Sequence, residues 1–142
     1  MKSLIRVGHG FDAHRLVEGQ MLVLGGVEIP YHQRLQGHSD ADVLIHAICD
    51  ALLGASGLGD IGNLFPDTDD RNRNRNSREF LTEVHRVLQS QAIGIVNVDV
   101  TLIAQAPKSV SYTHLRAPET EADLVCRLML EKKIWGGGGG GG

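Results

Sequence analysis

The sequence predicts an α+β domain in which helices are layered on one face of a mixed β-sheet. Two short apolar runs separated by Gly25 and Gly26 indicate a β-hairpin, and two longer segments carry apolar side chains at helical spacing. Strands and helices do not alternate strictly, which argues against a parallel α/β fold. A chain of 142 residues with 42% hydrophobic and 22% charged residues matches a single domain with one modest core.

The first quarter of the chain is predicted to be largely extended. Residues 5–7 have a short apolar strand pattern, and the following Asp12 and His14 are two positions apart, so they face the same way in an extended backbone. Residues 21–24 and 27–29 flank the two glycines, whose tolerance of positive φ suits a two-residue turn, and a proline closes this hairpin. The pattern places Asp12 and His14, two possible metal ligands, shortly before this hairpin.

A helix is predicted from Ser39 to about Leu53. Its first four residues have the capping-box form, in which Ser39 accepts from a free backbone N–H and Asp42 reaches back. The apolar side chains of this helix form one stripe, and Asp42, His46 and Asp50 are aligned at four-residue spacing on another face. Asp50 has two possible roles: it orients a metal-binding histidine, or it simply keeps this face of the helix solvated. We favour the second interpretation.

The middle of the chain combines a long loop with a second helix and a strand. Residues 54–70 are rich in Gly, Asp and Pro, which predicts a functional loop, and the polar residues 70–76 are interpreted as a solvated connector. Residues 77–91 have apolar side chains at helical spacing. Residues 95–103 alternate between apolar and polar side chains, which is typical of a half-buried strand.

The last quarter of the chain has a different character. Residues 109–120 show neither strand alternation nor a helical stripe, and residues 136–142 are seven consecutive glycines, a composition typical of a flexible coil. Residues 110–133 look like the conceptual translation of a sequencing adapter, so residues 109–142 are interpreted as an artefact that replaces the native C-terminus. The alternative is a genuine helix over residues 119–133 followed by a linker.

The bulk composition argues against several classes of partner. A formal net charge of -3 leaves no basic face for nucleic acid. No apolar run approaches the roughly 20 residues that cross a bilayer, and the N-terminus lacks a signal-peptide core. Cys49 and Cys126 lack the short paired spacing of a metal knuckle, and they suit a reducing compartment. We expect the cytoplasm or, after removal of a transit peptide, a plastid stroma.

Asp12, His14 and His46 together form a candidate metal site. One carboxylate and two imidazoles make three ligands, the usual number for a catalytic Zn²⁺ that keeps a fourth position open. The set alone does not decide the question, because a single helical histidine is more often a packed or surface residue than a ligand.

Five segments resemble the 2-C-methyl-D-erythritol 2,4-cyclodiphosphate synthase family, in that family's order and spacing, over residues 1 to about 108. They read GHGFDAH (8–14), GHSDADV (37–43, with a histidine after it), LGDIG (58–62), FPDTD (65–69) and NVDVTLIAQAPK (97–108). The family acts in non-mevalonate isoprenoid precursor synthesis. The resemblance implies that the 2-phosphate of 4-diphosphocytidyl-2-C-methyl-D-erythritol 2-phosphate attacks the β-phosphorus, closes a cyclic diphosphate and expels CMP.

The resemblance also implies roles for the phosphate-binding residues. Asp12, His14 and His46 bind Zn²⁺, whose open position takes a phosphate oxygen of this nucleotide-linked small molecule. His38 and Ser39 contact the phosphates, and His38 is the catalytic residue that stabilises the transition state. Both lie at the predicted helix N-terminus, where free N–H groups favour an anion, although Ser39 can equally be a plain cap.

Two loops match the family's remaining substrate contacts. The methylerythritol part is contacted by Asp60, Ile61, Gly62, Phe65, Pro66, Asp67, Thr68 and Asp69. The cytidine part is contacted by Ala104, Gln105, Ala106, Pro107 and Lys108. Ordinary turn chemistry is the alternative explanation of the first loop, and a strand exit stopped by proline is the alternative for the second.

The family's C-terminal part has no counterpart in residues 109–142. The family is a homotrimer with active sites between subunits, and its C-terminal Thr-Thr-Glu motif contacts the phosphates and a second cation, Mg²⁺ or Mn²⁺. The last core strand of the family is also missing, which leaves an unpaired sheet edge. We therefore expect the chain as printed to fold poorly and to be inactive, although the gene of its origin encodes an active enzyme.

Two other functions compete with this one. The first is a zinc phosphoesterase in which the same three ligands activate water. The second is a non-catalytic module that binds isoprenoid diphosphates and holds zinc for structure. This second function is disfavoured, because a structural zinc usually has four protein ligands.

Overall fold

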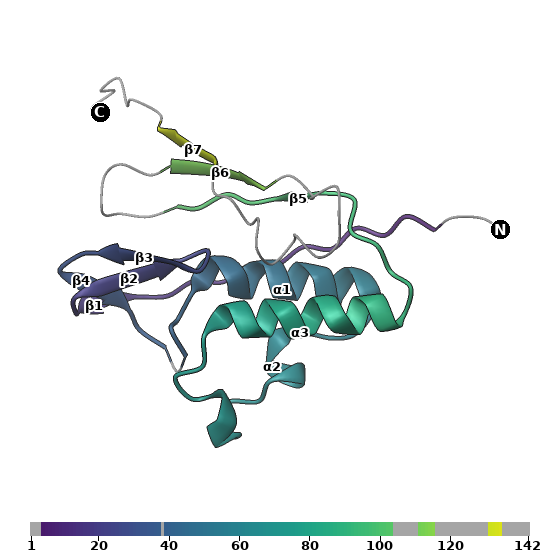
Figure 1. The fold of residues 1–142 in the computed structure, drawn as a ribbon, viewed down its shortest axis with the longest axis horizontal. Coiled ribbons are helices and arrows are strands. Elements are labelled where there is room, and N and C mark those ends of the chain that lie inside the picture. Colours follow the sequence, from purple (N-terminus) through teal and green to yellow (C-terminus); the bar gives the residue numbers. More distant parts are fainter. Residues whose placement is uncertain (1–3, 38, 104–110, 116–130, 135–142) are drawn as a thin grey trace. The chain divides into compact units, whose positions relative to one another are not determined.

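The computed structural model describes residues 4–37, 39–103, 111–115 and 131–134 and separates the chain into two compact units, Met1–Gly94 and Ile95–Gly142 (Figure 1). The first unit contains β1 (Leu16–Glu18), β2 (Met21–Leu24), β3 (Val27–Pro30), β4 (Gln33–Leu35), α1 (Val43–Ser56), α2 (Ile61–Leu64), the 3₁₀ turn η1 (Asp70–Asn72) and α3 (Ser77–Ser90). The second contains β5 (Val98–Asp99), β6 (Ser111–Leu115) and β7 (Glu131–Ile134). Mixed helices and antiparallel strands confirm the predicted α+β class.

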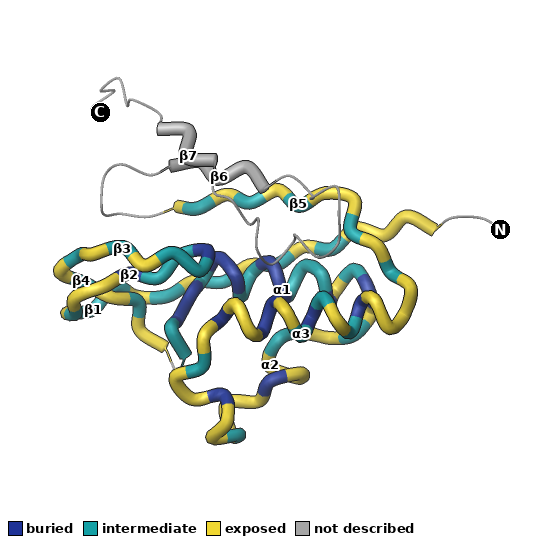
Figure 2. The backbone as a smooth tube through the Cα atoms, viewed as in Figure 1, coloured by how far each residue is buried: buried dark blue, intermediate teal, exposed yellow. Residues whose placement is uncertain are grey.

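The core of the first unit lies between α1 and α3, which pack side by side (Figure 1). Buried positions recur along both helices at helical spacing (Figure 2). They are Leu44, Ile45, Ile48 and Leu53 in α1 and Phe80, Leu81, Val84 and Leu88 in α3. Each such side chain stabilises the fold by roughly 1.5–3 kcal/mol relative to exposure. The predicted second helix is confirmed, with Gln91 as its C-cap.

The N-terminus of α1 differs from the prediction, because the N-cap is Asp42 and not Ser39. Asp42 is completely buried and accepts hydrogen bonds from the backbone N–H groups of Ile45 (3.1 Å), Gly25 (2.9 Å) and Gly26 (2.6 Å). Burial raises the pKa of this carboxyl group, and these three bonds oppose that effect. The carboxylate therefore occupies the helix N-terminus that was expected to attract an anion, and Asp42 does not share the polar face of His46.

The predicted hairpin is confirmed. Leu22 pairs with Ile29 across β2 and β3, and the connecting Gly25 and Gly26 have φ of 60° and 74°. Positive φ at both central positions is the reason for glycine in this two-residue turn. The structure adds an antiparallel pair, β1 with β4, that the sequence pattern did not predict.

The segment before β1, residues 4–15, contains no strand, so the strand predicted at residues 5–7 is wrong. Ile5 and Val7 are 84% and 90% exposed. The segment lies against α1, where a Cβ atom added to Gly10 would be 1.8 Å from the Ala47 carbonyl oxygen. A Cβ added to Gly8 would be 1.9 Å from the Ala51 carbonyl oxygen. The segment therefore approaches the backbone of α1 closely and forms no β-ladder.

The loop between α1 and α3 is more ordered than the sequence suggested. Asn72 is buried, and its side-chain amide donates to the Pro66 carbonyl oxygen at 2.9 Å. The Arg75 guanidinium lies 5.4 Å from the ring centroid of Phe65 and 5.2 Å from that of Phe80. Residues 70–76 are therefore not simply a solvated connector, since they pack this loop onto α3.

The second unit is a three-stranded antiparallel arrangement with the order β5-β6-β7. Of the strand predicted over residues 95–103, only β5 is paired, although alternate positions from Val98 to Leu102 are less exposed than their neighbours. β6 lies where no regular pattern was recognised. β7 occupies residues 131–134, so the alternative helix over residues 119–133 is wrong for its last three residues, and residues 119–130 lie outside the described part.

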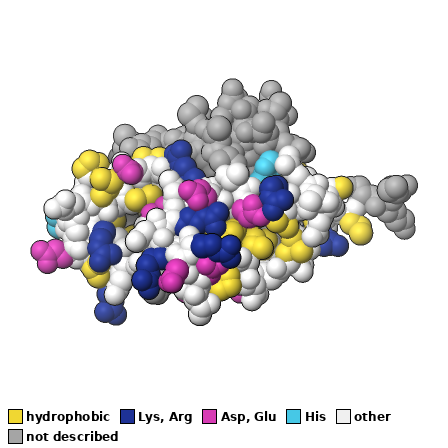
Figure 3. Space-filling view, turned by 60° about the horizontal axis from the view of Figure 1, so that its bottom comes forward, with side chains coloured by type: hydrophobic (Ala, Val, Ile, Leu, Met, Phe, Trp, Pro, Cys, Tyr) yellow, Lys and Arg dark blue, Asp and Glu magenta, His cyan; other side chains and the backbone are white. Residues whose placement is uncertain are grey.

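Charge is distributed without a single dominant sign on the face drawn in Figure 3, where Lys and Arg side chains are interspersed with Asp and Glu. Several arginines form ion pairs, namely Arg71 with Asp69, Arg75 with Glu79 and Arg86 with Glu83. Among the described helices, none has the length and apolar character of a membrane span.

Candidate metal centre

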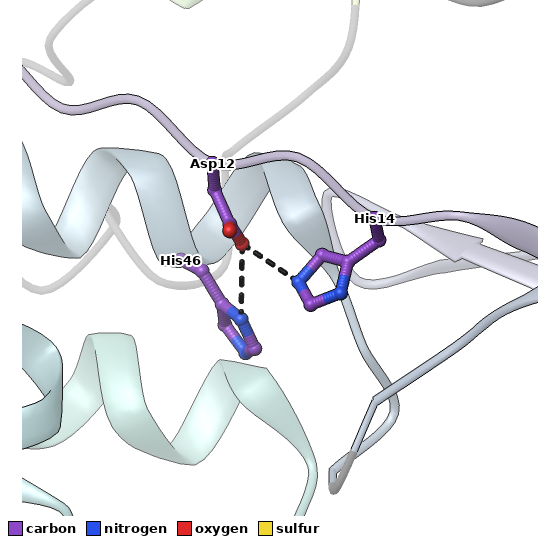
Figure 4. Close-up of side chains that lie close together, drawn as sticks. All are labelled: Asp12, His14 and His46. Carbon is purple, nitrogen blue, oxygen red and sulfur yellow. Dashed lines mark hydrogen bonds and ion pairs between the residues drawn. The ribbon is translucent and has the colours of Figure 1, made fainter.

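The three predicted metal ligands converge at one point in the first unit (Figure 4). Asp12 and His14 come from the irregular segment before β1, and His46 projects from the first turn of α1. The Asp12 Oδ2 atom lies 2.8 Å from His14 Nε2 and 3.4 Å from His46 Nδ1. One donor atom from each residue lies within 4.8 Å of the other two. The set is thus compact enough for one cation.

Electrostatics favour the ligating form of the carboxyl group. Burial opposes ionisation of Asp12, but hydrogen bonds and opposite charge from His46 and His14 outweigh it and lower its pKa. The other ring nitrogen of His14, Nδ1, lies 2.7 Å from the Gln36 carbonyl oxygen. Since a carbonyl only accepts, this Nδ1 carries a proton, which leaves Nε2 as the nitrogen of His14 available to a cation.

The donor set fits a divalent cation. Two imidazole nitrogens and one carboxylate oxygen leave a fourth position of a tetrahedral site open, as in catalytic zinc centres. Both histidines also have a partner at the nitrogen that faces away from Asp12, which is usual for ligand histidines because such a partner fixes the orientation of the ring.

A cavity of about 230 Å³ adjoins the three ligands. Eight predicted site residues line it: Asp12, His14, Ser39, His46, Ile61, Gly62, Phe65 and Asp67. Within it, the Ser39 hydroxyl oxygen is 3.3 Å from His46 Nε2. The N-terminal ligands, α1 and the loop that begins at α2 therefore share one cavity. Predicted residues His38 and Ala104 to Lys108 lie outside the described residues.

The other predicted loop residues have different surroundings. Asp60 is exposed and is the N-cap of α2, where its side chain accepts from the Asn63 N–H. Asp69 forms an ion pair with Arg71, whose hydrogen bonds lower the pKa of Asp69. Pro66 and Thr68 are exposed. None of these four is among the residues that line the cavity.

Four further residues line the cavity without having been predicted to contact substrate: Gly37, Asp50, Asn72 and Phe80. Asp50 accepts a hydrogen bond from the Ile61 N–H at 2.8 Å, so it neither orients a ligand histidine nor merely solvates α1. It holds the start of α2 against the helix that carries His46. The four-residue spacing of Asp50 from His46 was the feature of the sequence that could have identified it as a site residue. No local pattern identified Asn72.

Comparison with known proteins identifies close relatives. The sequence model of the YgbB family matches residues 5–125. The 2-C-methyl-D-erythritol 2,4-cyclodiphosphate synthase of Nitrosospira multiformis is 56% identical over 119 residues, which are 84% of this chain and 67% of that protein. The synthase of Desulfosudis oleivorans is 59% identical over 104 residues, 73% of this chain and 62% of that protein.

Solved structures agree with this comparison. A structure described as 2C-methyl-D-erythritol-2,4-cyclodiphosphate synthase in its CDP-bound form has a TM-score of 0.62 and 47% identity, and the match covers 66% of this chain and 63% of that chain. This chain therefore spans about two thirds of the length of the relatives that it matches.

Proposed function

Because the chain belongs to the YgbB family, we propose that it carries the metal-binding part of a 2-C-methyl-D-erythritol 2,4-cyclodiphosphate synthase. The reaction converts 4-diphosphocytidyl-2-C-methyl-D-erythritol 2-phosphate to the cyclic diphosphate and CMP in isoprenoid precursor synthesis. The observation that carries this proposal is the convergence of Asp12, His14 and His46 beside a cavity shared with the matched loop.

The proposed metal is zinc, held by Asp12 Oδ2, His14 Nε2 and His46 Nδ1. When bound, zinc supplies Lewis-acid polarisation of a phosphate oxygen. The nitrogen and oxygen donors and the number of protein ligands support this choice. We propose a second cation, Mg²⁺ or Mn²⁺, for the complete protein, whose C-terminal Thr-Thr-Glu motif would contact it.

The residues of this chain have mainly positioning tasks in the proposed reaction. Two phosphates of one molecule must approach in line, so orientation and charge neutralisation dominate over proton transfer. Ser39 and His38 are proposed to bind phosphate, with His38 as the catalytic residue. Ile61, Gly62, Phe65 and Asp67 line the cavity from the α2 side, and with the rest of residues 60–69 they are proposed to hold the methylerythritol part. Residues 104–108 are proposed to hold cytidine.

A homotrimer in the cytoplasm or plastid stroma is proposed as the working form. Apolar side chains are unusually exposed near the start of the first unit: Leu4 by 80%, Ile5 by 84%, Val7 by 90% and Phe11 by 78%. Neighbouring exposed apolar side chains suit a subunit interface. Light scattering coupled to size exclusion tests this assembly, and a monomer at all concentrations would contradict it.

The domain boundary is also a proposal. We assign residues 1–108 to the family domain and residues 109–142 to a tail that is foreign to the family. Sequencing the 3′ end of the gene tests this boundary, and an uninterrupted reading frame that encodes residues 109–142 would contradict it.

Phosphorus NMR of the reaction products tests the proposed activity. The chain completed with its native C-terminal sequence is incubated with substrate, zinc and magnesium, and we expect cyclic diphosphate together with CMP. Linear phosphate products would instead show a zinc phosphoesterase, and binding without turnover would show a non-catalytic module. His46→Ala should abolish turnover, whereas the matched control His85→Ala, on α3 outside the cavity, should retain it.

A further inference from the structure

Two side chains, Ser77 and Asp40, lie next to the metal ligand His46, on the side of its ring that faces away from Asp12. Ser77, the first residue of α3, is completely buried, and its Oγ lies 2.9 Å from His46 Nε2. The same hydroxyl group donates to Asp40 Oδ1, and the Ser77 backbone N–H donates to Asp40 Oδ2 at 2.8 Å. Ser77 belongs to none of the matched segments, and Asp40 was assigned no role.

The protons in this cluster can be counted. A serine hydroxyl has one hydrogen and two lone pairs, and a carboxylate only accepts. Since the Ser77 hydrogen is directed to Asp40, the oxygen presents a lone pair to His46 Nε2. Two lone pairs facing each other at 2.9 Å would repel, so Nε2 carries the hydrogen and donates to Ser77. Asp12 Oδ2 is a weaker competitor for the proton, since it lies 3.4 Å from Nδ1 whereas Ser77 Oγ lies 2.9 Å from Nε2. The neutral ring then has its own lone pair on Nδ1, the atom that faces the metal site.

We propose that Asp40 and Ser77 are positioning residues that select the Nε2–H tautomer of His46 and thereby make Nδ1 its metal-binding atom. The carboxylate is itself fixed, because Asp40 Oδ1 also accepts from the Asp42 N–H at 3.1 Å. Ser39 Oγ is a weaker competitor for Nε2, since it lies farther away at 3.3 Å and already accepts from the Ala41 N–H. The tautomer of His46 is therefore selected mainly by Ser77, at the start of α3.

The two ligand histidines then carry their protons on different ring nitrogens. The Gln36 carbonyl oxygen holds the proton of His14 on Nδ1, so His14 binds through Nε2. Ser77 holds the proton of His46 on Nε2, so His46 binds through Nδ1. A backbone carbonyl performs the first task and cannot be removed by substitution, but a side chain performs the second. This inference rests on the proposed metal site.

The experiment has two readouts, the tautomer of His46 in the metal-free chain and the zinc affinity. Long-range ¹H–¹⁵N spectra recorded well above the ordinary histidine pKa near 6.5 distinguish Nε2–H from Nδ1–H. We expect Nε2–H in the wild type, a mixture of tautomers in Ser77→Ala, and zinc binding weakened about 10–100-fold in that variant. Ser77→Thr keeps the hydroxyl group and should recover the single tautomer.

Ser56→Ala is the matched control. Ser56 is also a buried helical serine, but its hydroxyl donates to the Leu52 carbonyl oxygen, away from the ligands. Its loss should leave the tautomer and the zinc affinity unchanged. An Nδ1–H tautomer in the wild type, or equal zinc affinities of Ser77→Ala and Ser56→Ala, would overturn this inference alone. Absence of zinc binding by the wild type would overturn the proposed metal site and this inference with it.

Discussion

Two regions of different construction supply the metal ligands, the irregular segment of residues 4–15 and the helix α1. The helix has its own hydrogen bonds, a buried apolar stripe and caps at both ends, so its position is fixed by features that repeat along the sequence. The segment has no ladder, exposes Ile5 and Val7, and touches α1 through Gly8 and Gly10. The difference teaches that two of the three ligands, Asp12 and His14, depend on a segment that can approach α1 only because Gly8 and Gly10 have no side chain.

The largest loss of stability is expected from Asp42→Ala, which detaches α1 from the hairpin. The substitution removes a helix cap and leaves the buried Gly25 N–H and the partly buried Gly26 N–H without their acceptor. A lost cap costs about 1 kcal/mol and each buried unpaired donor about 1–3 kcal/mol, so we expect a destabilisation of roughly 3 kcal/mol. Urea denaturation measures it.

Asn76→Ala is the matched cap control. Asn76 caps α3 by accepting only from the Arg78 N–H, so its loss should cost about 1 kcal/mol. Equal losses for the two variants would show that the bonds from the hairpin to Asp42 contribute nothing, and α1 would then not be anchored as described.

Gly10→Ala should damage the segment and spare the helix. A Cβ at this position meets the Ala47 carbonyl oxygen at 1.8 Å, so the segment must move away from α1 and carry Asp12 with it. Overpacking of this kind costs about 1–3 kcal/mol, and we expect zinc affinity to fall at least about tenfold. Zinc competition titration and urea denaturation provide the two measurements.

Gly54→Ala is the control within α1. A Cβ at Gly54 meets nothing within 4 Å, and alanine favours a helix over glycine by about 1 kcal/mol. This variant should be as stable as the wild type or more stable, with unchanged zinc affinity. If Gly10→Ala behaved in the same way, the close approach of the segment to α1 would not position Asp12.

Arg6→Ala should have the smallest effect of the series. The exposed Arg6 side chain donates to the Ser56 carbonyl oxygen at 3.2 Å, a contact between the start of the segment and the end of α1. A solvent-accessible hydrogen bond of this kind contributes no more than about 1 kcal/mol, and zinc affinity should not change. A large loss of zinc would show that Arg6, and not the glycines, holds the segment.

The same contrast explains which parts of the fold were predictable. α3 and the hairpin follow from helical spacing and from a two-glycine turn, both of which are local patterns. The start of α1 was misplaced because Ser39 and Asp42 both have cap chemistry, and the hairpin amides that favour Asp42 are 16 and 17 residues away. The strand predicted at residues 5–7 failed because apolar residues in an exposed segment have the same short pattern as a strand.

The site was predictable to a similar degree. The triad was identified by its donor types together with the family resemblance, and the strand geometry invoked for Asp12 and His14 was not the one observed. Asp40 and Ser77 could not be predicted, because 37 residues separate them and neither has a local signal for contact with the other. Asn72 was hidden in a polar run that resembled a solvated connector.

The central claim is that residues 4–15 and α1 jointly form one metal site, and the zinc content of histidine variants tests it most directly. The chain completed with its native C-terminal sequence is purified with zinc, as are its variants His14→Ala, His46→Ala, His32→Ala and His85→Ala, and all are analysed for metal. His32 is exposed next to β4 and His85 lies on α3, and neither lines the cavity. We predict about one zinc per chain in the wild type and both controls, and loss of zinc in His14→Ala and His46→Ala alike. Equal zinc content in all four variants would contradict the account.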